Sequence, residues 1–392
     1  MARDIQPTNE APAGERVPFR RYIGYFLGLG TWGFGGPIAT VGYMQRDLVE
    51  GRGWISRRDF LDGVALGQTM PGPLAAQVAM WVGYLQARAV GALGTAIPFI
   101  LPSLAIVLGV AYLYIRFEGL TVVQSLFYGI APAVMAIIAF AAVKLARLTN
   151  SKDLRLWGIS AVIMSVTALT GAEIAVLFVA AGLAMVIWDA PPRFLKRGGA
   201  SSVLGLTVPF SVLTGTATAG TLVALGLFFL KAGAFIFGSG LAIVPFLREG
   251  VVNQRHWLTE RQFLDAVAIG LITPGPVVIT AAFIGYLVGG MAGAGIATVA
   301  IFTPIYLGVV IPGRWFIRHR DNAQIQAFVK GATAAAAGAI AGATIVLTRQ
   351  AVVDLPTVGI LAVSLLFVWR LKNREPILVL VAGAAGLLMK RL

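Results

Sequence analysis

Two motifs, Pro71-Gly72-Pro73 and Pro274-Gly275-Pro276, have the most readily interpreted chemistry in this sequence. As a helix, the apolar run of residues 60–70 before the first motif rises about 17 Å, roughly half of a 30 Å hydrocarbon core. The motif then breaks the helix, because proline removes a backbone donor and glycine lets the chain bend. Its second proline can begin a new half-helix, which leaves the N–H groups of Leu74 and Ala75 unpaired at the positive end. Such ends bind anions, so the motif predicts an oxyanion site near the membrane midplane.

A Phe-Gly-Gly-Pro motif at residues 34–37 follows the same logic. Its glycines permit close backbone approach, and Pro37 can begin a helix whose free donors are Ile38 and Ala39. The second copy, residues 237–240, reads Phe-Gly-Ser-Gly and lacks the proline. A purely structural alternative exists, because small residues let membrane helices pack closely. Duplication of the motifs favours the binding interpretation.

Polar side chains inside the apolar runs extend the prediction, because such groups are costly in a membrane and mark functional sites. Gln68 and Gln77 flank the first Pro-Gly-Pro motif, and each amide can donate two N–H bonds. Lys231 can supply positive charge for a dianion, or it can extend its ammonium group to the membrane interface. Ser239 adds a hydroxyl in the second copy.

Asp62 and Asp265 occupy equivalent positions about two turns before the two Pro-Gly-Pro motifs. A carboxylate partly withdrawn from water suits the role of a proton carrier, because burial favours its protonated form. The alternative is a salt bridge to Arg58 or Arg261, which precede the two aspartates by one turn.

The predicted substrate-binding residues come from both copies of the motifs and their flanks. They are Phe34, Gly35, Gly36, Pro37, Gln68, Pro71, Gly72, Pro73, Leu74, Ala75, Gln77, Lys231, Gly238, Ser239, Gly240, Pro274, Gly275 and Pro276. The sequence has no cysteine and lacks a phosphate-binding loop and a nucleophile elbow, so no metal site, cofactor or catalytic residue is predicted. We expect a transporter rather than an enzyme, either driven by an ion gradient or the membrane potential or passive.

Membrane helices must position these residues. Hydrophobic residues make up 58% of the chain and charged residues 12%, about half the charged fraction of a soluble protein. Apolar runs long enough for membrane segments lie near residues 22–44, 60–86, 90–115, 121–147, 154–170, 172–188, 221–247, 263–288, 290–312, 325–347, 355–370 and 375–390. The sequence therefore predicts an all-α polytopic membrane protein with roughly 10–12 transmembrane or re-entrant segments and broken helices.

The helices that lead into the Pro-Gly-Pro motifs carry start sequences. Ser56 and Thr259 precede Asp59 and Gln262 by three residues, each just before an apolar run. This spacing predicts capping boxes, in which the hydroxyl accepts from a backbone N–H and the later side chain reaches back.

The chain consists of two related halves. An offset of 203 residues relates Trp54 to Trp257 and the first Pro-Gly-Pro motif to the second, and an offset of 202 relates Pro102 to Pro304. So many matches in one register indicate an internal duplication. We expect a flexible tail at residues 1–18, a first repeat at 19–188, a linker at 189–207 and a second repeat at 208–392.

The basic residues predict that the second repeat is inverted in the membrane. The loops after the third to sixth segments hold one, four, no and three Lys or Arg residues in the first half, and three, one, three and two in the second. The basic loops are thus out of phase by one segment, which under the positive-inside rule indicates inverted-topology repeats. The net charge of +14 is ordinary for such a protein, and no nucleic-acid partner is expected.

The motifs together resemble the CHR family of chromate ion transporters. The similarity is carried by the Phe-Gly-Gly-Pro and Pro-Gly-Pro motifs with Trp54, Gln68, Gln77 and Gly83, and by the run Phe99-Ile100-Leu101-Pro102-Ser103. It extends from about Phe19 to Leu392 with two copies, as in the long-chain members of the family.

The resemblance implies a secondary transporter in the bacterial inner membrane that exports chromate with the proton-motive force and confers chromate resistance. Sulfate is the structural analogue, and uptake or exchange of sulfate or another oxyanion is the alternative function. The expected partners are chromate, sulfate as a competitor, the lipid bilayer and, as an open alternative, a second copy in a homodimer. The departures in the second copy imply two unequal sites, with the first copy dominant in binding.

Overall fold

The computed structural model describes most of this chain as helix. The described residues are 17–33, 36–117, 121–170, 175–191, 219–236, 240, 243–313, 315, 322–370 and 375–389. Within these ranges there is no strand, as the sequence predicts for an all-α protein. The predicted site residues Phe34, Gly35, Gly238 and Ser239 lie outside the described residues, as do most of the expected tail and linker.

The first repeat begins with two helical hairpins. They are formed by α1 (Phe19–Trp32) with α2 (Gly36–Met44) and its π-helical extension η1 (Gln45–Gly51), and by α3 (Arg57–Thr69) with the first arm of α4 (Leu74–Phe117). In the first hairpin, the Tyr25 hydroxyl donates to Asp47 Oδ2 across 3.4 Å. In the second, Trp81 Nε1 donates to the carbonyl of Asp59 across 2.9 Å. The paired helices are therefore antiparallel, and each hairpin returns to the face where it began.

Helix α4 reverses direction at residues 87–88, where the dihedral angles are not helical. The hydroxyl of Thr95 donates to the carbonyl of Ala79 across 2.7 Å, so the two arms of α4 lie side by side. Gly83 and Gly91 allow this approach, because a Cβ atom on either would collide with the backbone of the other. The second arm, which we call the long arm of α4, continues to the opposite face of the molecule.

The second repeat has the same order of elements. They are α8 (Ala219–Ala234), α9 (Ile243–Arg248) with its π-helical extension η3 (Glu249–Gln254), α10 (Glu260–Ile272), the short turn η4 (Val277–Ile279) and α11 (Thr280–Val310). Helix α11 reverses at Gly289 and Gly290, the positions equivalent to the reversal in α4, and its second part is the long arm of α11. The duplication in sequence is therefore a duplication in structure.

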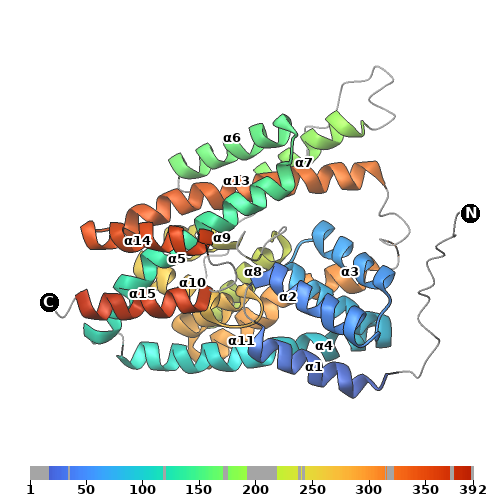
Figure 1. The fold of residues 1–392 in the computed structure, drawn as a ribbon, viewed down its shortest axis with the longest axis horizontal. Coiled ribbons are helices and arrows are strands. Elements are labelled where there is room, and N and C mark those ends of the chain that lie inside the picture. Colours follow the sequence, from blue (N-terminus) through green and yellow to red (C-terminus); the bar gives the residue numbers. More distant parts are fainter. Residues whose placement is uncertain are drawn as a thin grey trace, which may run out of the picture.

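The two repeats have opposite orientations, as the basic residues predict. Tyr306, late in the long arm of α11, donates its hydroxyl to the carbonyl of Ala89 at the start of the long arm of α4, across 3.2 Å. At the other end, Tyr114 of α4 donates to Asp265 Oδ2 of α10 across 2.7 Å. The long arms thus run antiparallel. Figure 1 shows the result, with α1, α2 and α3 toward one end of the long axis and α10 and α15 toward the other.

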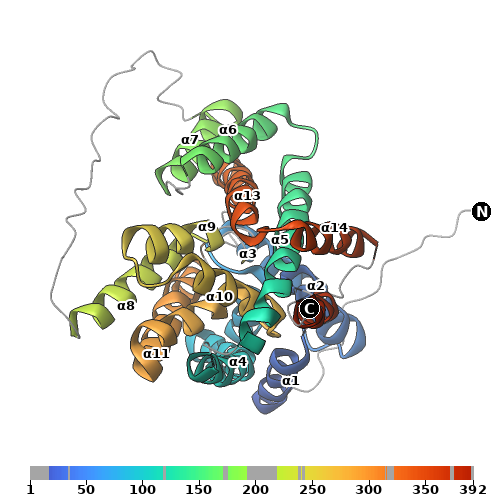
Figure 2. The same cartoon turned by 90° about the vertical axis from the view of Figure 1, so that its left-hand side faces the viewer.

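The remaining helices interlock the repeats. They are α5 (Thr121–Asn150), α6 (Leu154–Thr170), α7 (Ala175–Asp189), α13 (Ala323–Ala351), α14 (Leu355–Arg370) and α15 (Glu375–Met389). Helices α6 and α7 of the first repeat pack on α13 of the second, and α14 and α15 of the second pack on α5 of the first (Figure 2). Small residues allow close approach here: Cβ atoms on Gly338 and Gly129 would collide with the backbones of Ser160 and Ala382.

Both predicted helix starts into the Pro-Gly-Pro segments are capped. Thr259 and Gln262 form the complete capping box, with hydrogen bonds of 3.2 and 3.1 Å between side chains and backbone N–H groups. Ser56 accepts from the backbone N–H of Asp59 across 3.1 Å. The Asp59 carboxylate accepts from the Ser56 hydroxyl, whereas in a complete capping box it would accept from the Ser56 backbone N–H. The second hairpin therefore begins with the complete predicted box, and the first begins with the Ser56 cap alone.

The protein is a multi-pass membrane protein. Among the residues that the structure describes, four helices are long and apolar enough to cross a membrane, within α4, α5, η4–α11 and α13. Helix α5 has 30 residues and so extends about 45 Å, more than a hydrocarbon core. Large apolar side chains such as Val90, Leu154 and Leu169 are exposed on the outer surface, where lipid chains can cover them.

Candidate functional site

The two Pro-Gly-Pro motifs form the tips of the second hairpin in each repeat. Gly72 has a φ of +144° and Gly275 a φ of +96°, which residues with a Cβ atom rarely adopt. These angles turn the chain back, so the predicted half-helices lie side by side instead of end to end. The motifs therefore break the helices as the sequence indicates, and each motif forms the turn of a helical hairpin.

Each tip docks against the other repeat through one of two equivalent hydrogen bonds. The N–H of Gly72 donates to the carbonyl of Ile236 across 2.6 Å, and the N–H of Gly275 donates to the carbonyl of Gly33 across 3.4 Å. Ile236 and Gly33 follow α8 and α1, and the same offset of 203 residues relates them. The residues directly before the two Phe-Gly motifs, Gly33 and Ile236, therefore lie beside the Pro-Gly-Pro tips of the opposite repeats.

The structure brings Gly240 to the same place. A Cβ atom built on Gly240 would lie 3.6 Å from the Cβ of Pro73 and 3.6 Å from that of Val277. The two half-helix starts and the end of the second Phe-Gly-Ser-Gly motif therefore meet at one point. Gly36 and Pro37 begin α2, as the sequence predicts for a proline that starts a helix.

The half-helix starts leave backbone donors at this point. The N–H groups of Ala76 and Gln77 donate to the carbonyl of Pro73 across 3.0 and 3.1 Å. The donors before them, those of Leu74 and Ala75, come too early in α4 to have a partner within the helix.

The second repeat repeats the arrangement, because the N–H of Ile279 donates to the carbonyl of Pro276 across 3.0 Å. The N–H groups of Val277 and Val278 thus precede the first paired donor. Both valines are buried, so these donors lie away from bulk water.

Gln77 differs from its predicted role as a donor to substrate. Its side chain is fully buried, and Nε2 donates to the carbonyls of Met70 and Pro71 across 3.2 and 3.0 Å. These carbonyls end α3, and a helix end in an apolar interior needs donors from elsewhere. Gln77 therefore holds the first tip in shape, while its Oε1 is buried without a partner among the described residues.

Ser103 is a residue of this region that the sequence analysis did not select. It lies on the long arm of α4, and its hydroxyl donates to the carbonyl of Pro274 across 2.6 Å. Its equivalent on α11 is Ile305, which packs beside Gly72. A serine next to Pro102 in a duplicated apolar run, replaced by isoleucine in the other copy, was the available indication.

Gln68 and Lys231 lie at exposed positions, unlike the buried tips. Gln68 is on the exposed side of α3 near its end. Lys231 is in the last turn of α8, and its Nζ lies 5.7 Å from the centroid of the Phe246 ring. An ammonium group above an aromatic ring is attracted to its face, so the second repeat itself stabilises this charge.

The two aspartates are both buried, with 9% of Asp62 and 3% of Asp265 exposed. Asp265 accepts the Tyr114 hydrogen bond from the other repeat. The Tyr114 ring packs edge-on against Phe283, which holds the hydroxyl in place. Phe316, outside the described residues, is the sequence equivalent of Tyr114 and has no hydroxyl, so this contact has no counterpart of the same chemistry in the other repeat.

The chemistry that this region offers is hydrogen bonding to an anion. Its polar groups are backbone N–H groups at two helix starts, with amide and hydroxyl side chains shaping the tips. Within the described ranges, no cluster of three His, Asp or Glu side chains could hold a metal ion. Such a set of donors binds an oxyanion without placing a full positive charge against it.

Comparisons with known proteins agree with this reading of the motifs. A family model described as chromate transporter matches residues 21–188 and again residues 223–387. A chromate transport protein of Cupriavidus metallidurans is 47% identical over 390 residues, which cover 97% of each chain. A probable chromate transport protein of Synechococcus elongatus is 46% identical over 93% of this chain and 94% of its own.

A third relative, a chromate transport protein of Pseudomonas aeruginosa, is 30% identical over 93% of this chain and 91% of its own. No solved structure matches this chain. The family model covers both repeats, including both Pro-Gly-Pro tips and the helices that dock on them. The chain therefore belongs to the chromate transporter family.

Proposed function

We propose that this protein is a secondary transporter that exports chromate across the bacterial inner membrane and is driven by the proton-motive force. The observation that carries the proposal is the meeting of the two hairpin tips, each bonded to the opposite repeat. Transporters built from inverted repeats bind their substrates at such interfaces, near broken helices. The chromate transport proteins among its relatives support chromate as the substrate.

The donors at the tips suit a compact tetrahedral dianion. The backbone N–H groups at the starts of α4 and η4 lie at the positive ends of the half-helices, where anions are stabilised. A site without a fixed cation at contact distance binds more weakly and releases its substrate more readily, which transport requires. In this proposal, Leu74, Ala75, Val277 and Val278 supply the donors, and the two Phe-Gly motifs complete the site.

The basic residues support the proposed orientation of the protein in the membrane. The helix ends on the face where α1 begins carry many of them: Arg20, Arg21, Arg57, Arg58, Lys144, Arg147, Lys152 and Arg155. By the positive-inside rule this face is cytoplasmic. A cytoplasmic oxyanion would then enter along the first repeat and leave along the second.

The proposed coupling uses the buried aspartates. Asp62 and Asp265 lie on the entry helices of the two hairpins, about two turns from the tips. Protonation of a carboxylate at that depth changes the local charge beside an anion site, which links proton movement to substrate release. Their burial and their equivalent positions in the two repeats support this role.

The test is chromate flux in everted membrane vesicles that are energised by respiration. We expect accumulation of unreduced chromate that an uncoupler abolishes and that sulfate reduces by competition. The variants Asp62→Asn and Asp265→Asn are expected to lose uncoupler-sensitive accumulation but to retain exchange of internal for external chromate. Uptake of sulfate by right-side-out vesicles, without chromate accumulation in everted ones, would instead establish an oxyanion importer.

A further inference from the structure

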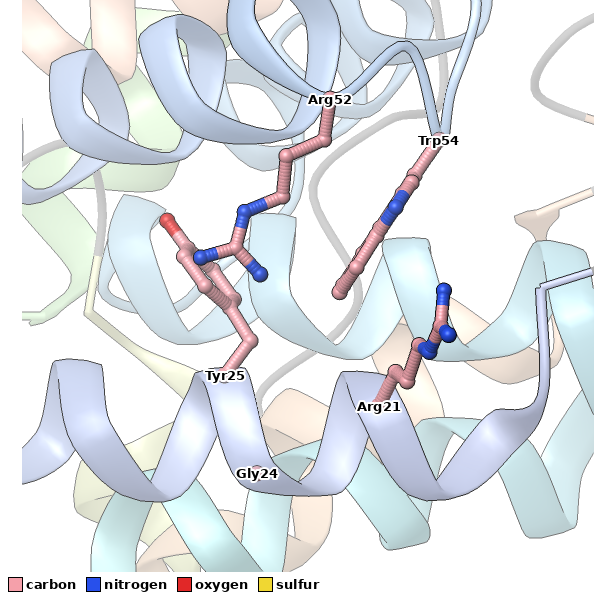
Figure 3. Close-up of a pocket in the computed structure, with 5 residues that line it drawn as sticks. All are labelled: Arg21, Gly24, Tyr25, Arg52 and Trp54. Carbon is pink, nitrogen blue, oxygen red and sulfur yellow. The ribbon is translucent and has the colours of Figure 1, made fainter.

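A groove lies between α1 and the segment after α2, away from the hairpin tips. Its outer end is lined by Arg21, Tyr25, Arg52 and Trp54 (Figure 3), and its inner part by Arg46 and by the end of α1. We call it the arginine groove. The inner cavity has a volume of about 390 Å³, and the outer cavity, which shares Tyr25 and Arg52 with it, about 460 Å³.

The arginine groove is strongly cationic. Asp47 is its carboxylate, and this side chain is already engaged by Arg46 Nε at 2.8 Å and by the Tyr25 hydroxyl. Arg21 and Arg52 form no ion pair with any carboxylate of the described residues. Two guanidinium groups therefore remain uncompensated, which matches the charge of a dianion.

The position of Arg52 leaves its donors accessible. Its guanidinium lies 4.7 Å from the centroid of the Trp54 ring and 5.3 Å from that of Tyr25. Figure 3 shows the guanidinium between the two side chains, with Arg21 on the neighbouring turn of α1. Stacking uses the faces of a guanidinium and leaves its N–H edge free for bidentate bonding to an oxyanion.

The groove leads toward the hairpin tips. It follows α1 past Gly24 and Gly28 to Trp32 and Gly33. A Cβ atom on Gly24 or Gly28 would meet nothing within 4 Å, so this side of α1 is open. The carbonyl of Gly33 is the acceptor for Gly275 at the second tip, which connects the inner end of the groove to the candidate site.

The equivalent region of the second repeat carries larger side chains. Phe228 replaces Tyr25, and its ring stacks on Phe246 at 5.5 Å and meets Trp257 edge-on at 5.9 Å. Leu227 and Lys231 stand where the first repeat has its two open glycines. Arg255 still stacks on Trp257 at 4.8 Å, so the arginine–tryptophan pair is part of the fold whereas the two open glycines belong to the first repeat.

We infer that the arginine groove is a second binding site for a tetrahedral oxyanion, with Arg52 as its main ligand and Arg21 and Arg46 in support. It collects the anion from the face where α1 begins and passes it along the open side of α1 to the tips. The role in transport rests on the proposed function, whereas binding by the groove stands on its own. The proposed ligand is a free oxyanion, because the groove reaches Gly33, whose carbonyl accepts the N–H of Gly275 at the second tip.

The test compares two ways of disabling the groove. Arg52→Gln removes the main ligand, and Gly24→Leu copies the second repeat and fills the floor without removing charge. We expect each to weaken sulfate and chromate binding to the purified protein, and to raise the transport KM, on the order of ten- to a hundredfold, with kcat little changed. Arg255→Gln, which removes the equivalent arginine stacked on Trp257 in the second repeat, is the matched control. It is expected to change the binding affinity and the transport KM by less than about twofold.

The outcomes separate the groove from the proposed function. If both groove variants melted like the wild type and kept its KM and its affinity, the inference that the groove binds an oxyanion would be overturned. If the wild type moved no oxyanion, the proposed function would fail, and loss of equilibrium binding in the two variants would still support the groove. Assays in phosphatidylcholine vesicles with and without phosphatidylglycerol identify the ligand. An effect of Arg52→Gln that needs the anionic lipid would assign the groove to a lipid headgroup and overturn the inference.

Discussion

The two hairpin tips share a backbone but differ in how their carbonyl groups are satisfied. Both have a glycine with positive φ, and both donate an N–H to the carbonyl that follows the first helix of the other repeat. At the first tip, Gln77 of the same hairpin donates to the two carbonyls that follow α3. At the second, the donor is Ser103, which belongs to the other repeat. Duplication preserved the chain path, while the polar groups that support it diverged.

The same difference appears away from the tips. Tyr114 of the first repeat donates to Asp265 of the second. The second repeat has Phe316 at the equivalent position, which has no hydroxyl to donate to the first. The arginine groove lies in the first repeat, and at the equivalent place in the second repeat Phe228 stacks on Phe246 and leucine and lysine replace the two glycines. The first repeat thus supplies support and access, and the second depends on it. Substitutions at paired positions measure how far this dependence goes.

The largest effect is expected from the tip glycines. Gly275→Ala forces a residue with a Cβ atom into a positive φ and against the Ser103 hydroxyl, and Gly72→Ala does so against Gln77. Each is expected to cost about 1–3 kcal/mol in backbone strain alone and to abolish most transport. Thermal unfolding in detergent and chromate flux are the measurements. Gly109→Ala, where a Cβ would meet open space, is the control, and equal losses in all three would contradict the prediction.

The bond between Tyr114 and Asp265 comes next. Tyr114→Phe keeps the packed ring but leaves the buried carboxylate without that donor, so we expect a loss of roughly 1.5–3 kcal/mol in stability. Tyr112→Phe, on the same helix but exposed, is expected to change stability by less than about 0.5 kcal/mol. Denaturation curves of the two variants provide the comparison. If they coincided, the contact between repeats would carry no stability.

Ser103→Ala tests whether the second tip depends on the first repeat. It leaves the carbonyl of Pro274 without its donor, which we expect to cost roughly 1–2 kcal/mol and to lower transport. Ser103→Thr keeps the hydroxyl and is expected to retain more of both. Ser103→Ile copies the residue that the second repeat has at this position, Ile305, and is expected to behave like the alanine variant or worse. A fully active isoleucine variant would show that the second tip holds itself, as the first does.

The smallest effect is expected at Lys231. Its ammonium group lies over Phe246 at an exposed position, and an exposed contact of this kind contributes up to about 1 kcal/mol. Lys231→Gln is therefore expected to change the KM for chromate by less than about fivefold. Lys231→Arg serves as the charge-preserving control. If the KM for chromate rose tenfold or more in the glutamine variant but not in the arginine variant, Lys231 would be a ligand of the dianion, as its position in the sequence predicts.

The sequence by itself determined the local features of this protein. Proline and glycine must break a helix wherever they occur together, so the positions of both tips could be predicted from spacing. Capping residues marked where the entry helices begin, and the phase of the basic loops predicted the inverted second repeat. These features depend on neighbouring residues or on repetition, which a linear chain records directly.

Only the tertiary structure decided which groups satisfy the broken backbone. A broken helix in an apolar interior must find donors for its last carbonyls, yet nothing local says which. Gln77 was predicted to face the substrate and is used by its own tip, while Ser103 serves a carbonyl 171 residues away. The direction of the half-helices was open as well, since the spacing does not specify the positive φ of Gly72 and Gly275 that turns the chain back. Sequence spacing locates an unpaired group, but its partner depends on which segments the fold brings together.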